Sequence, residues 1–481
     1  MSQVLNTKVK TATKWSAIGE VSAKLVAPIT SMVLARLLTP EAFGVVTTLT
    51  MVITFAEIFT DAGFQKYLVQ HDFKDEQDQD ESTNVAFWSN LVMSLLIWGI
   101  ITIFADPLAA LVGNPGLGHI LIVACVSIPL AAFSSIQMAL FRRELDFKTL
   151  FKVRMVATLI PLLVTVPLAF WMRSYWALVI GTIILNIVNA ILLTLFSKWK
   201  PRLFYSFDKL KEMFSFTVWS VIEAISIWLT SYVDVFIVGT MLSQYFLGLY
   251  KTSSTLVGQI MGLITSITTP ILFSSLSRLQ NDEKEFQRLF FRFQKLVGLL
   301  IIPIGMGIFI FKDLVTDILL GSQWGEAAGF VGLWGLTSAI AIVLAQYCSE
   351  VYRAKGKPKI SVLAQVLHIV VLWPVLLIAV KYGFETLYIA RSLVRFEYIA
   401  VHICLMAFVI KIPAGKMITN ILPSCIAAIS MLVVLLLPSP DSIFEFIFYA
   451  AIATFLYLGV VVLFKEERAT LLNIPKMIKN K

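Results

Sequence analysis

Charged residues are scarce in this sequence. They make up 14% of the 481 residues, whereas 58% are hydrophobic. A typical soluble domain has about 25% charged and about 45–50% apolar residues. The four cysteines, Cys125, Cys348, Cys404 and Cys425, lie singly, and neither they nor the four histidines show metal-ligand spacing. We therefore expect the cysteines to be small apolar packing residues, and the sequence predicts no metal site.

Other signals are also absent. No glycine-rich phosphate-binding loop is present, so ATP is not expected to act directly, and no cofactor is predicted. The loops between apolar runs leave no room for an extramembrane domain. The outer loops lack the carboxylate clusters that a membrane glycosyltransferase or polymerase would need, so we expect a protein that is not an enzyme. No small-residue cleavage pattern follows the first apolar run, which is therefore expected to be retained as a helix.

The sequence does contain many apolar runs, each long enough to span a bilayer. Because a span needs about 20 mostly apolar residues, the runs predict about fourteen transmembrane helices. Their approximate limits are 15–38, 43–61, 83–104, 118–140, 153–172, 175–196, 214–239, 246–270, 289–311, 327–352, 360–380, 385–410, 417–437 and 443–464. The predicted fold class is thus an all-α polytopic membrane protein.

Lysine and arginine gather on one side of the predicted spans. The segments on the side of the N-terminus hold 31 of the 39 basic residues, while the opposite loops hold four and the spans four. An excess of Lys and Arg marks the cytoplasmic side, so both termini are predicted to lie in the cytoplasm and the protein in the inner membrane. The net charge of +9 is then a topology signal, with some attraction to anionic lipids, and predicts no nucleic-acid partner.

A repeat with an offset of 204 residues runs through the chain. Trp15–Ile18 (WSAI) recurs as Trp219–Ile222 (WSVI), and Gly44 corresponds to Gly248. Each copy would hold six helices, and an even number keeps both copies in the same orientation, with a substrate site expected between them. The alternative is chance similarity between apolar stretches.

The repeat predicts three parts of the chain. These are an N-lobe at residues 1–200, a C-lobe at 201–412, and two further helices with a cytoplasmic tail at 413–481. The two lobes would be related by a pseudo-twofold axis along the membrane normal.

Three groups of residues form motifs, namely Ala35–Gly44 (ARLLTPEAFG), Phe59–Phe64 with Leu68–Gln70, and Asp234 with Gly239 and Gly248–Tyr250. These motifs resemble those of the polysaccharide (oligosaccharide-lipid) flippases of Wzx type, in the multidrug/oligosaccharidyl-lipid/polysaccharide exporter (MOP) superfamily. The resemblance implies two six-helix lobes around a central cavity. It also implies a substrate, an undecaprenyl-diphosphate-linked oligosaccharide, that is moved to the outer leaflet by alternating access for capsule, O-antigen or exopolysaccharide synthesis.

The resemblance implies membrane lipids, a polysaccharide polymerase and chain-length proteins as partners. Two other functions stay open. A cation-coupled multidrug exporter of the same superfamily would favour an acidic, aromatic cavity over a cationic one. A membrane enzyme of polysaccharide assembly is less compatible with the short outer loops and the repeat.

A polar stripe in the predicted helix 385–410 is the first candidate for substrate binding. Tyr388, Arg391, Arg395, Tyr398 and His402 follow one another by 3, 4, 3 and 4 residues and therefore share one helix face. Two arginines one turn apart can bind a diphosphate bidentately, and the tyrosines can stack on sugar rings. The alternative is that the arginines only neutralise nearby glutamates or lie between the lobes.

Ionisable residues in other spans are further candidates, because charge inside a membrane is costly. Lys24 is predicted to bind substrate together with the two arginines, although a structural pair with Glu20 is the alternative. Glu57, Glu223 and Asp234 are predicted to take part in coupling or gating. Glu223 and Asp234 are eleven residues apart and therefore within about 20° of each other around their helix.

Overall fold

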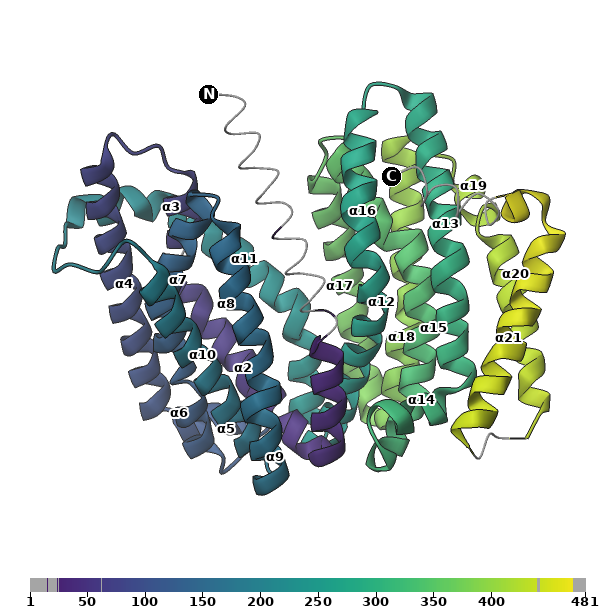
Figure 1. The fold of residues 1–481 in the computed structure, drawn as a ribbon, viewed down its shortest axis with the longest axis horizontal. Helices are drawn as coiled ribbons and strands as arrows, with labels where there is room; N and C mark the ends of the chain where they lie inside the picture. The colour runs from purple at the N-terminus through teal and green to yellow at the C-terminus, as the bar shows by residue number, and fades with distance from the viewer. Residues whose placement is uncertain (1–14, 16–23, 25, 62, 439–441, 470–481) are drawn as a thin grey trace. The chain divides into compact units, whose positions relative to one another are not determined.

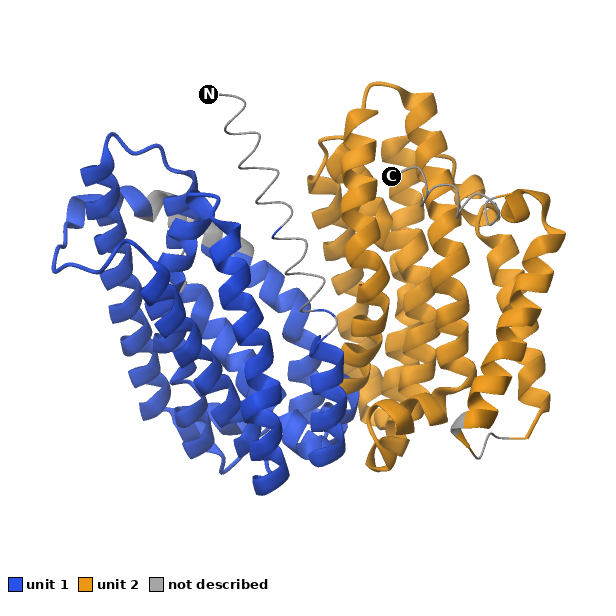
Figure 2. Ribbon diagram, viewed as in Figure 1, with its two compact units in different colours: residues 1–251 blue, residues 252–481 orange. Residues whose placement is uncertain are grey.

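The computed structural model describes residues 15, 24, 26–61, 63–438 and 442–469, and this part of the chain is helical without strands (Figure 1). The chain divides into two compact units, residues 1–251 and 252–481 (Figure 2). The lobe boundary predicted at residue 200 refers to the sequence repeat and stays a prediction.

Unit 1 contains a short apolar helix at Val26–Leu37, in its first continuous described segment. Its labelled elements are α2 (Pro40–Asp61), α3 (Phe64–Gln70), α4 (Glu76–Ile103), α5 (Ala105–Leu111), α6 (Gly118–Ala124), α7 (Ser127–Arg143), α8 (Phe147–Ile160), the π-helix η1 (Pro161–Thr165), α9 (Val166–Met172), α10 (Trp176–Phe196) and α11 (Phe207–Met241). Helix α12 (Gln244–Arg278) starts in unit 1 and continues into unit 2.

Unit 2 contains the rest of α12 and the elements that follow it. They are α13 (Glu283–Ile310), α14 (Lys312–Leu319), η2 (Ser322–Ala327), α15 (Ala328–Ala341), η3 (Ile342–Gln346), α16 (Tyr347–Ala354), α17 (Lys359–Ala379), η4 (Val380–Tyr382), α18 (Phe384–Leu405), η5 (Met406–Ile410), α19 (Ala414–Thr419), α20 (Leu422–Ser430), η6 (Met431–Leu436) and α21 (Ile443–Leu463).

In the described part of the chain, 13 helices are long and apolar enough to cross a membrane, which makes the chain a multi-pass membrane protein. They follow the last thirteen predicted spans in order. The first predicted span, 15–38, lies partly outside the described residues. The short break predicted after Met172 is confirmed, because Arg173 takes a left-handed φ of 46° there and α10 begins at Trp176.

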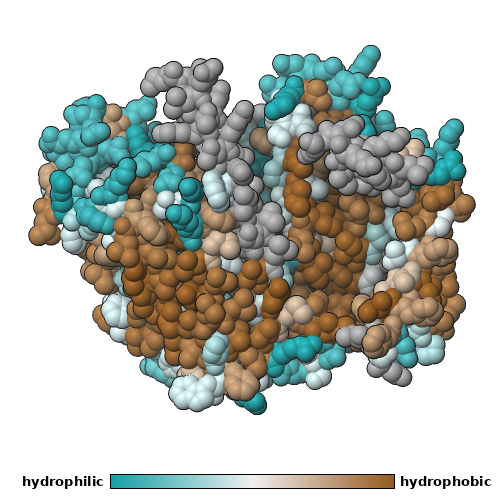
Figure 3. Space-filling model, viewed as in Figure 1, coloured by the Kyte–Doolittle hydropathy of each residue, from teal (hydrophilic) through white to brown (hydrophobic). Residues whose placement is uncertain are grey.

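The surface of each unit carries the expected apolar band. On the visible face, hydrophobic residues cover the middle of the helices and hydrophilic residues cover their ends (Figure 3). Large side chains such as Ile103, Trp171 and Phe455 are more than three-quarters exposed. Contact with lipid explains this exposure, since backbone groups inside helices are already hydrogen-bonded and apolar side chains can face the bilayer.

Each unit also has a packed interior. In unit 1, Val45, Leu49 and Ile128 belong to one buried cluster that includes Cys125. In unit 2, Trp324, Phe290 and Tyr347 are among the largest fully buried side chains. The packing role predicted for cysteine fits Cys125 and Cys348, which are buried, but Cys404 is exposed on α18.

Within unit 1, the first turns of α2 and α12 cross at two glycines. A Cβ atom on Gly44 would lie 1.9 Å from the carbonyl oxygen of Gln244, and one on Gly248 would lie 1.8 Å from the carbonyl oxygen of Pro40. No residue with a side chain fits such a contact without a shift of the backbone. Residues 40 and 44 correspond to 244 and 248 at the repeat offset, so the contact is reciprocal and supports the repeat.

A polar cluster joins α4 and α11 near the hydrophilic end of unit 1. The ammonium of Lys209 lies 2.5 Å from the Asp78 carboxylate and 3.2 Å from that of Glu81. Burial alone would lower the pKa of Lys209, but its hydrogen bonds to the two carboxylates raise that pKa above its ordinary value. The lysine therefore stays charged and ties the start of α11 to α4.

Candidate functional site

The two arginines of the polar stripe share one aromatic partner. Arg391 and Arg395 lie on α18, and their guanidinium carbons are 4.8 Å and 3.4 Å from the ring centre of Trp334 on α15. Trp334 is buried, so its ring is held in place by its neighbours. Cation–π attraction thus keeps two like charges near each other inside a membrane span.

Tyr388 begins the stripe in a cluster of aromatic rings. Its ring centre is 5.5 Å from that of Phe384 and 5.9 Å from that of Phe330. A Cβ atom on Gly329 would lie 2.4 Å from the Tyr388 hydroxyl. Tyr388 is therefore closely packed against the first turn of α15.

The other end of the stripe is a network of histidine and tyrosine. The Tyr352 hydroxyl lies 3.1 Å from Nδ1 of His402, and their rings are stacked. Tyr398 packs between two imidazoles, 4.5 Å from His402 and 4.8 Å from His368 between ring centres. His402 is 1% exposed, so it is an interior residue here, and its role in substrate binding stays a prediction.

His368 makes the interhelical hydrogen bond that its position in an apolar helix favours. Its Nδ1 lies 2.8 Å from Oε2 of Glu397, which joins α17 to α18. The hydrogen-bond partner of Glu397 is therefore a histidine of the preceding helix. Around α18, Glu397 lies about 120° from Arg391 and about 160° from Arg395, so it is on another face of the helix.

The predicted coupling residues and Lys24 all belong to unit 1. Asp234 on α11 accepts a hydrogen bond of 2.7 Å from the hydroxyl of Tyr250 on α12. Glu57 on α2 lines a cavity of about 420 Å³. Of Glu223 the structure describes only the backbone, within α11, and Lys24 is half-buried.

The predicted residues thus form two groups. The stripe lies in unit 2, and Lys24, Glu57, Glu223 and Asp234 lie in unit 1. The prediction that Lys24 and the arginines bind one diphosphate together stays a prediction. Glu20, the alternative partner of Lys24, is outside the described residues.

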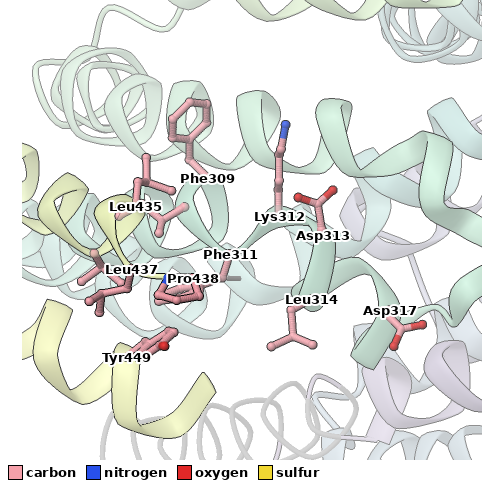
Figure 4. Close-up of a pocket in the computed structure, with 12 residues that line it drawn as sticks. Phe309, Phe311, Lys312, Asp313, Leu314, Asp317, Leu435, Leu437, Pro438 and Tyr449 are labelled. Carbon is pink, nitrogen blue, oxygen red and sulfur yellow. The ribbon is translucent and has the colours of Figure 1, made fainter. Parts of the chain in front are cut away.

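The residue spacing in the sequence did not predict the position of the cavities. One of about 550 Å³ in unit 2 contains no residue of the stripe; Lys312, Asp313 and Asp317 line it beside Pro438 and Tyr449 (Figure 4). The cavity at Glu57 has a different lining, with three asparagines, Asn90, Asn186 and Asn189. Asn186 and Asn189 are three residues apart in an otherwise apolar run. This spacing of two amides could have indicated a polar site, but the prediction considered mainly charged residues.

Across the described ranges, no group of three or more His, Cys, Asp or Glu side chains is arranged to hold a metal ion. What the described site residues offer is fixed positive charge, aromatic rings and hydrogen-bonding side chains within apolar helices.

Known proteins resemble this chain along most of its length. It is 23% identical over 341 residues to the succinoglycan biosynthesis transport protein ExoT of Rhizobium meliloti (strain 1021), covering 71% of this chain and 68% of ExoT. It is 21% identical over 325 residues to the lipopolysaccharide biosynthesis protein WzxC of Escherichia coli (strain K12), covering 67% of this chain and 65% of WzxC.

A solved structure shares the fold. The lipid II flippase MurJ, in an inward closed conformation, superposes with a TM-score of 0.73 over 95% of this chain and 99% of that chain, at 15% identity. The family model described as "Polysaccharide biosynthesis protein" matches residues 33–329, more than half of the sequence. The resemblance found in the sequence motifs is thereby confirmed, and the chain belongs to the polysaccharide biosynthesis protein family.

Proposed function

We propose that this protein is a flippase that moves an undecaprenyl-diphosphate-linked oligosaccharide across the inner membrane for surface polysaccharide synthesis. The observation that carries the proposal is the pair Arg391 and Arg395, held over Trp334 within a span. A diphosphate in a low-dielectric interior is prohibitively costly unless cations pair with it. The family match and the likeness to the two named transport and lipopolysaccharide proteins support the same function.

The residues have separate proposed roles. Arg391, Arg395 and Lys24 bind the diphosphate, and Tyr388, Tyr398 and His402 contact the sugar. Binding of an anion between like charges would favour the closed arrangement of an alternating-access cycle, because it removes their repulsion.

Three carboxylates of unit 1 take part in coupling or gating, namely Glu57, Glu223 and Asp234. The protein catalyses no covalent step in this proposal. Both termini lie in the cytoplasm, and the polymerase and chain-length proteins receive the translocated product.

Deletion of the protein, followed by lipid analysis of the cells, tests the function. Accumulation of lipid-linked oligosaccharide in the cytoplasmic leaflet is the expected result. Unpolymerised units in the outer leaflet would instead indicate an enzyme of assembly. Normal surface polysaccharide with greater drug sensitivity would indicate a multidrug exporter.

Substitution of the arginine pair tests the site. Arg391→Gln with Arg395→Gln should abolish export at a normal membrane level, while the two Lys replacements should keep part of it, since Lys cannot bind bidentately. Arg288→Gln with Arg292→Gln is a matched control, because these arginines are also four residues apart in unit 2 but exposed on α13. Normal export by the first double variant would show that the arginines are structural.

A further inference from the structure

Unit 1 contains two neighbouring cavities that the predicted site did not include. The first, which we call the amide pocket, has a volume of about 420 Å³ and is lined in part by Glu57, Asn90, Ser135, Asn186 and Asn189. The second, the basic pocket, has a volume of about 380 Å³ and is lined in part by Arg142, Arg154, Trp15, Phe151 and Leu150. Met138 and Asn189 line both cavities, so the two adjoin each other.

The amide pocket contains an unused hydrogen-bond acceptor. Nδ2 of Asn90 donates to the Ser135 hydroxyl at 2.7 Å and to the Ala132 carbonyl at 3.4 Å, which fixes the orientation of the amide. Its Oδ1 atom has no hydrogen-bond partner among the described residues, although Asn90 is only 1% exposed. A buried acceptor left unpaired costs free energy, and a donated hydroxyl would remove that cost once neighbouring side chains move to expose the atom, which is inaccessible here.

Other polar groups that line the amide pocket can also exchange hydrogen bonds with hydroxyls, and one lining residue, Lys66, is a cation. Asn186 and Asn189 stand almost one turn apart on α10, and Glu57 faces the cavity from α2. Amides both donate and accept hydrogen bonds, and so do sugar hydroxyls, whereas a carboxylate accepts from two hydroxyls. Such a group of side chains is expensive inside a membrane span and therefore indicates a function.

The basic pocket combines positive charge with an apolar wall. Its described lining contains two guanidinium groups, those of Arg142 and Arg154, and no carboxylate. Nη1 of Arg142 lies 3.3 Å from Oε1 of Gln65, a residue that lines the amide pocket. On the apolar side the rings of Trp15 and Phe151 are 4.9 Å apart.

We propose that unit 1 has its own binding site for the head group of the lipid-linked substrate, formed by these two pockets. The sugar lies in the amide pocket, the diphosphate between Arg142 and Arg154, and the first prenyl units against Trp15 and Phe151. Together the two pockets offer the three chemistries that such a lipid needs, namely apolar, cationic and hydrogen-bonding surfaces. This inference rests on the proposed function and adds a site separate from the arginine pair of α18.

The competing explanation is that Arg142 and Arg154 only orient the chain in the membrane. Both lie in the basic segment 141–154, which is predicted to be cytoplasmic. The same segment provides a matched control, since Lys148 and Lys152 are exposed, as Arg142 and Arg154 are, but line neither pocket. Arg142→Gln with Arg154→Gln and Lys148→Gln with Lys152→Gln remove the same charge from the same segment, so orientation alone predicts equal effects.

Binding to the purified full-length protein tests the proposal, with Arg391→Gln and Arg395→Gln present in every protein compared so that the other proposed diphosphate site is removed. The probes are undecaprenyl diphosphate, which has no sugar, and the lipid-linked oligosaccharide isolated from cells that lack the protein. The arginine double variant should bind both probes at least about tenfold more weakly, because two charge-assisted contacts are lost. The lysine double variant should bind both like the parent protein that has only the Arg391→Gln and Arg395→Gln substitutions.

The role of the amide pocket is tested by comparing the same two probes, which differ only in the sugar. Asn186→Ala with Asn189→Ala should bind undecaprenyl diphosphate normally and lose the extra affinity that the sugar provides. Unchanged binding of both probes by the arginine variant, or an equal loss in the lysine variant, would overturn the proposal. If deletion cells accumulate no lipid-linked oligosaccharide, the proposed function itself fails, which is a different result.

Discussion

The reciprocal contact between Gly44 and Gly248 allows a quantitative prediction about stability. Heavy atoms essentially never approach a Cβ within 3.0 Å, so alanine at position 44 requires its contact to lengthen from 1.9 Å by at least 1.1 Å, and alanine at 248 requires a lengthening from 1.8 Å by at least 1.2 Å. The opposing atoms are backbone carbonyls of Gln244 and Pro40, which cannot rotate away. The first turns of α2 and α12 must therefore separate.

Each single alanine variant should lose about 1–3 kcal/mol of stability, as other overpacked sites do. The double variant should lose less than the sum, by about 0.5–3 kcal/mol, because one separation of the two helices relieves both contacts. Unfolding of the purified protein in detergent, compared across the wild type, both single variants and the double variant, measures this difference.

The control lies on the same helix. Gly258→Ala and Gly262→Ala in α12 meet no atom within 4 Å, and alanine favours a helix over glycine by about 1 kcal/mol. These variants should be as stable as the wild type or slightly more so. The prediction would be refuted if the double variant lost as much stability as the two single variants together. It would also be refuted if the single variants lost no more stability than Gly258→Ala and Gly262→Ala.

Three further predictions concern other contacts. A reporter fused at Asn114 should indicate the outer side and one fused at Gln79 the cytoplasmic side; the opposite result at either position would contradict the predicted topology. Tyr250→Phe should lower stability by about 1.5–3 kcal/mol, since it removes the hydrogen bond to the Asp234 carboxylate, and an equal loss in an Asp234→Ala background, which has no acceptor side chain, would show that the bond is not the cause. Trp334→Phe keeps a ring beneath both arginines and should retain most polysaccharide export, whereas Trp334→Leu should lose it; equal export at equal protein level would show that the ring is not needed.

The sequence was sufficient to predict the helices, because the bilayer imposes a length and an apolar composition that can be read locally. Even the brief break at Met172 was visible, since Arg173 and Ser174 interrupt two apolar runs. The spacing of Arg391 and Arg395 also predicted that they share a face. Those features depend on neighbours along one helix.

Partners on other helices could not be predicted in this way. Nothing in the spacing of the arginines identifies Trp334, more than fifty residues earlier, as the ring that holds them. The pairing of Tyr352 with His402 depends on how α16 packs against α18. Uncharged polar residues such as Asn90 occur throughout the sequence, so their identity alone does not mark them as site candidates. Their position around one cavity depends on how the helices pack and is seen only in the structure.

The crossing of α2 and α12 has the form of an isologous interface, in which the same surface is used twice about a twofold axis. Residues 40 and 44 meet residues 244 and 248 as they would meet their own copies in a homodimer of one repeat. In such a dimer any substitution at the glycine would appear on both sides at once. In the single chain each side can change alone, so the two sides can become unequal while the contact between the first turns of α2 and α12 is kept.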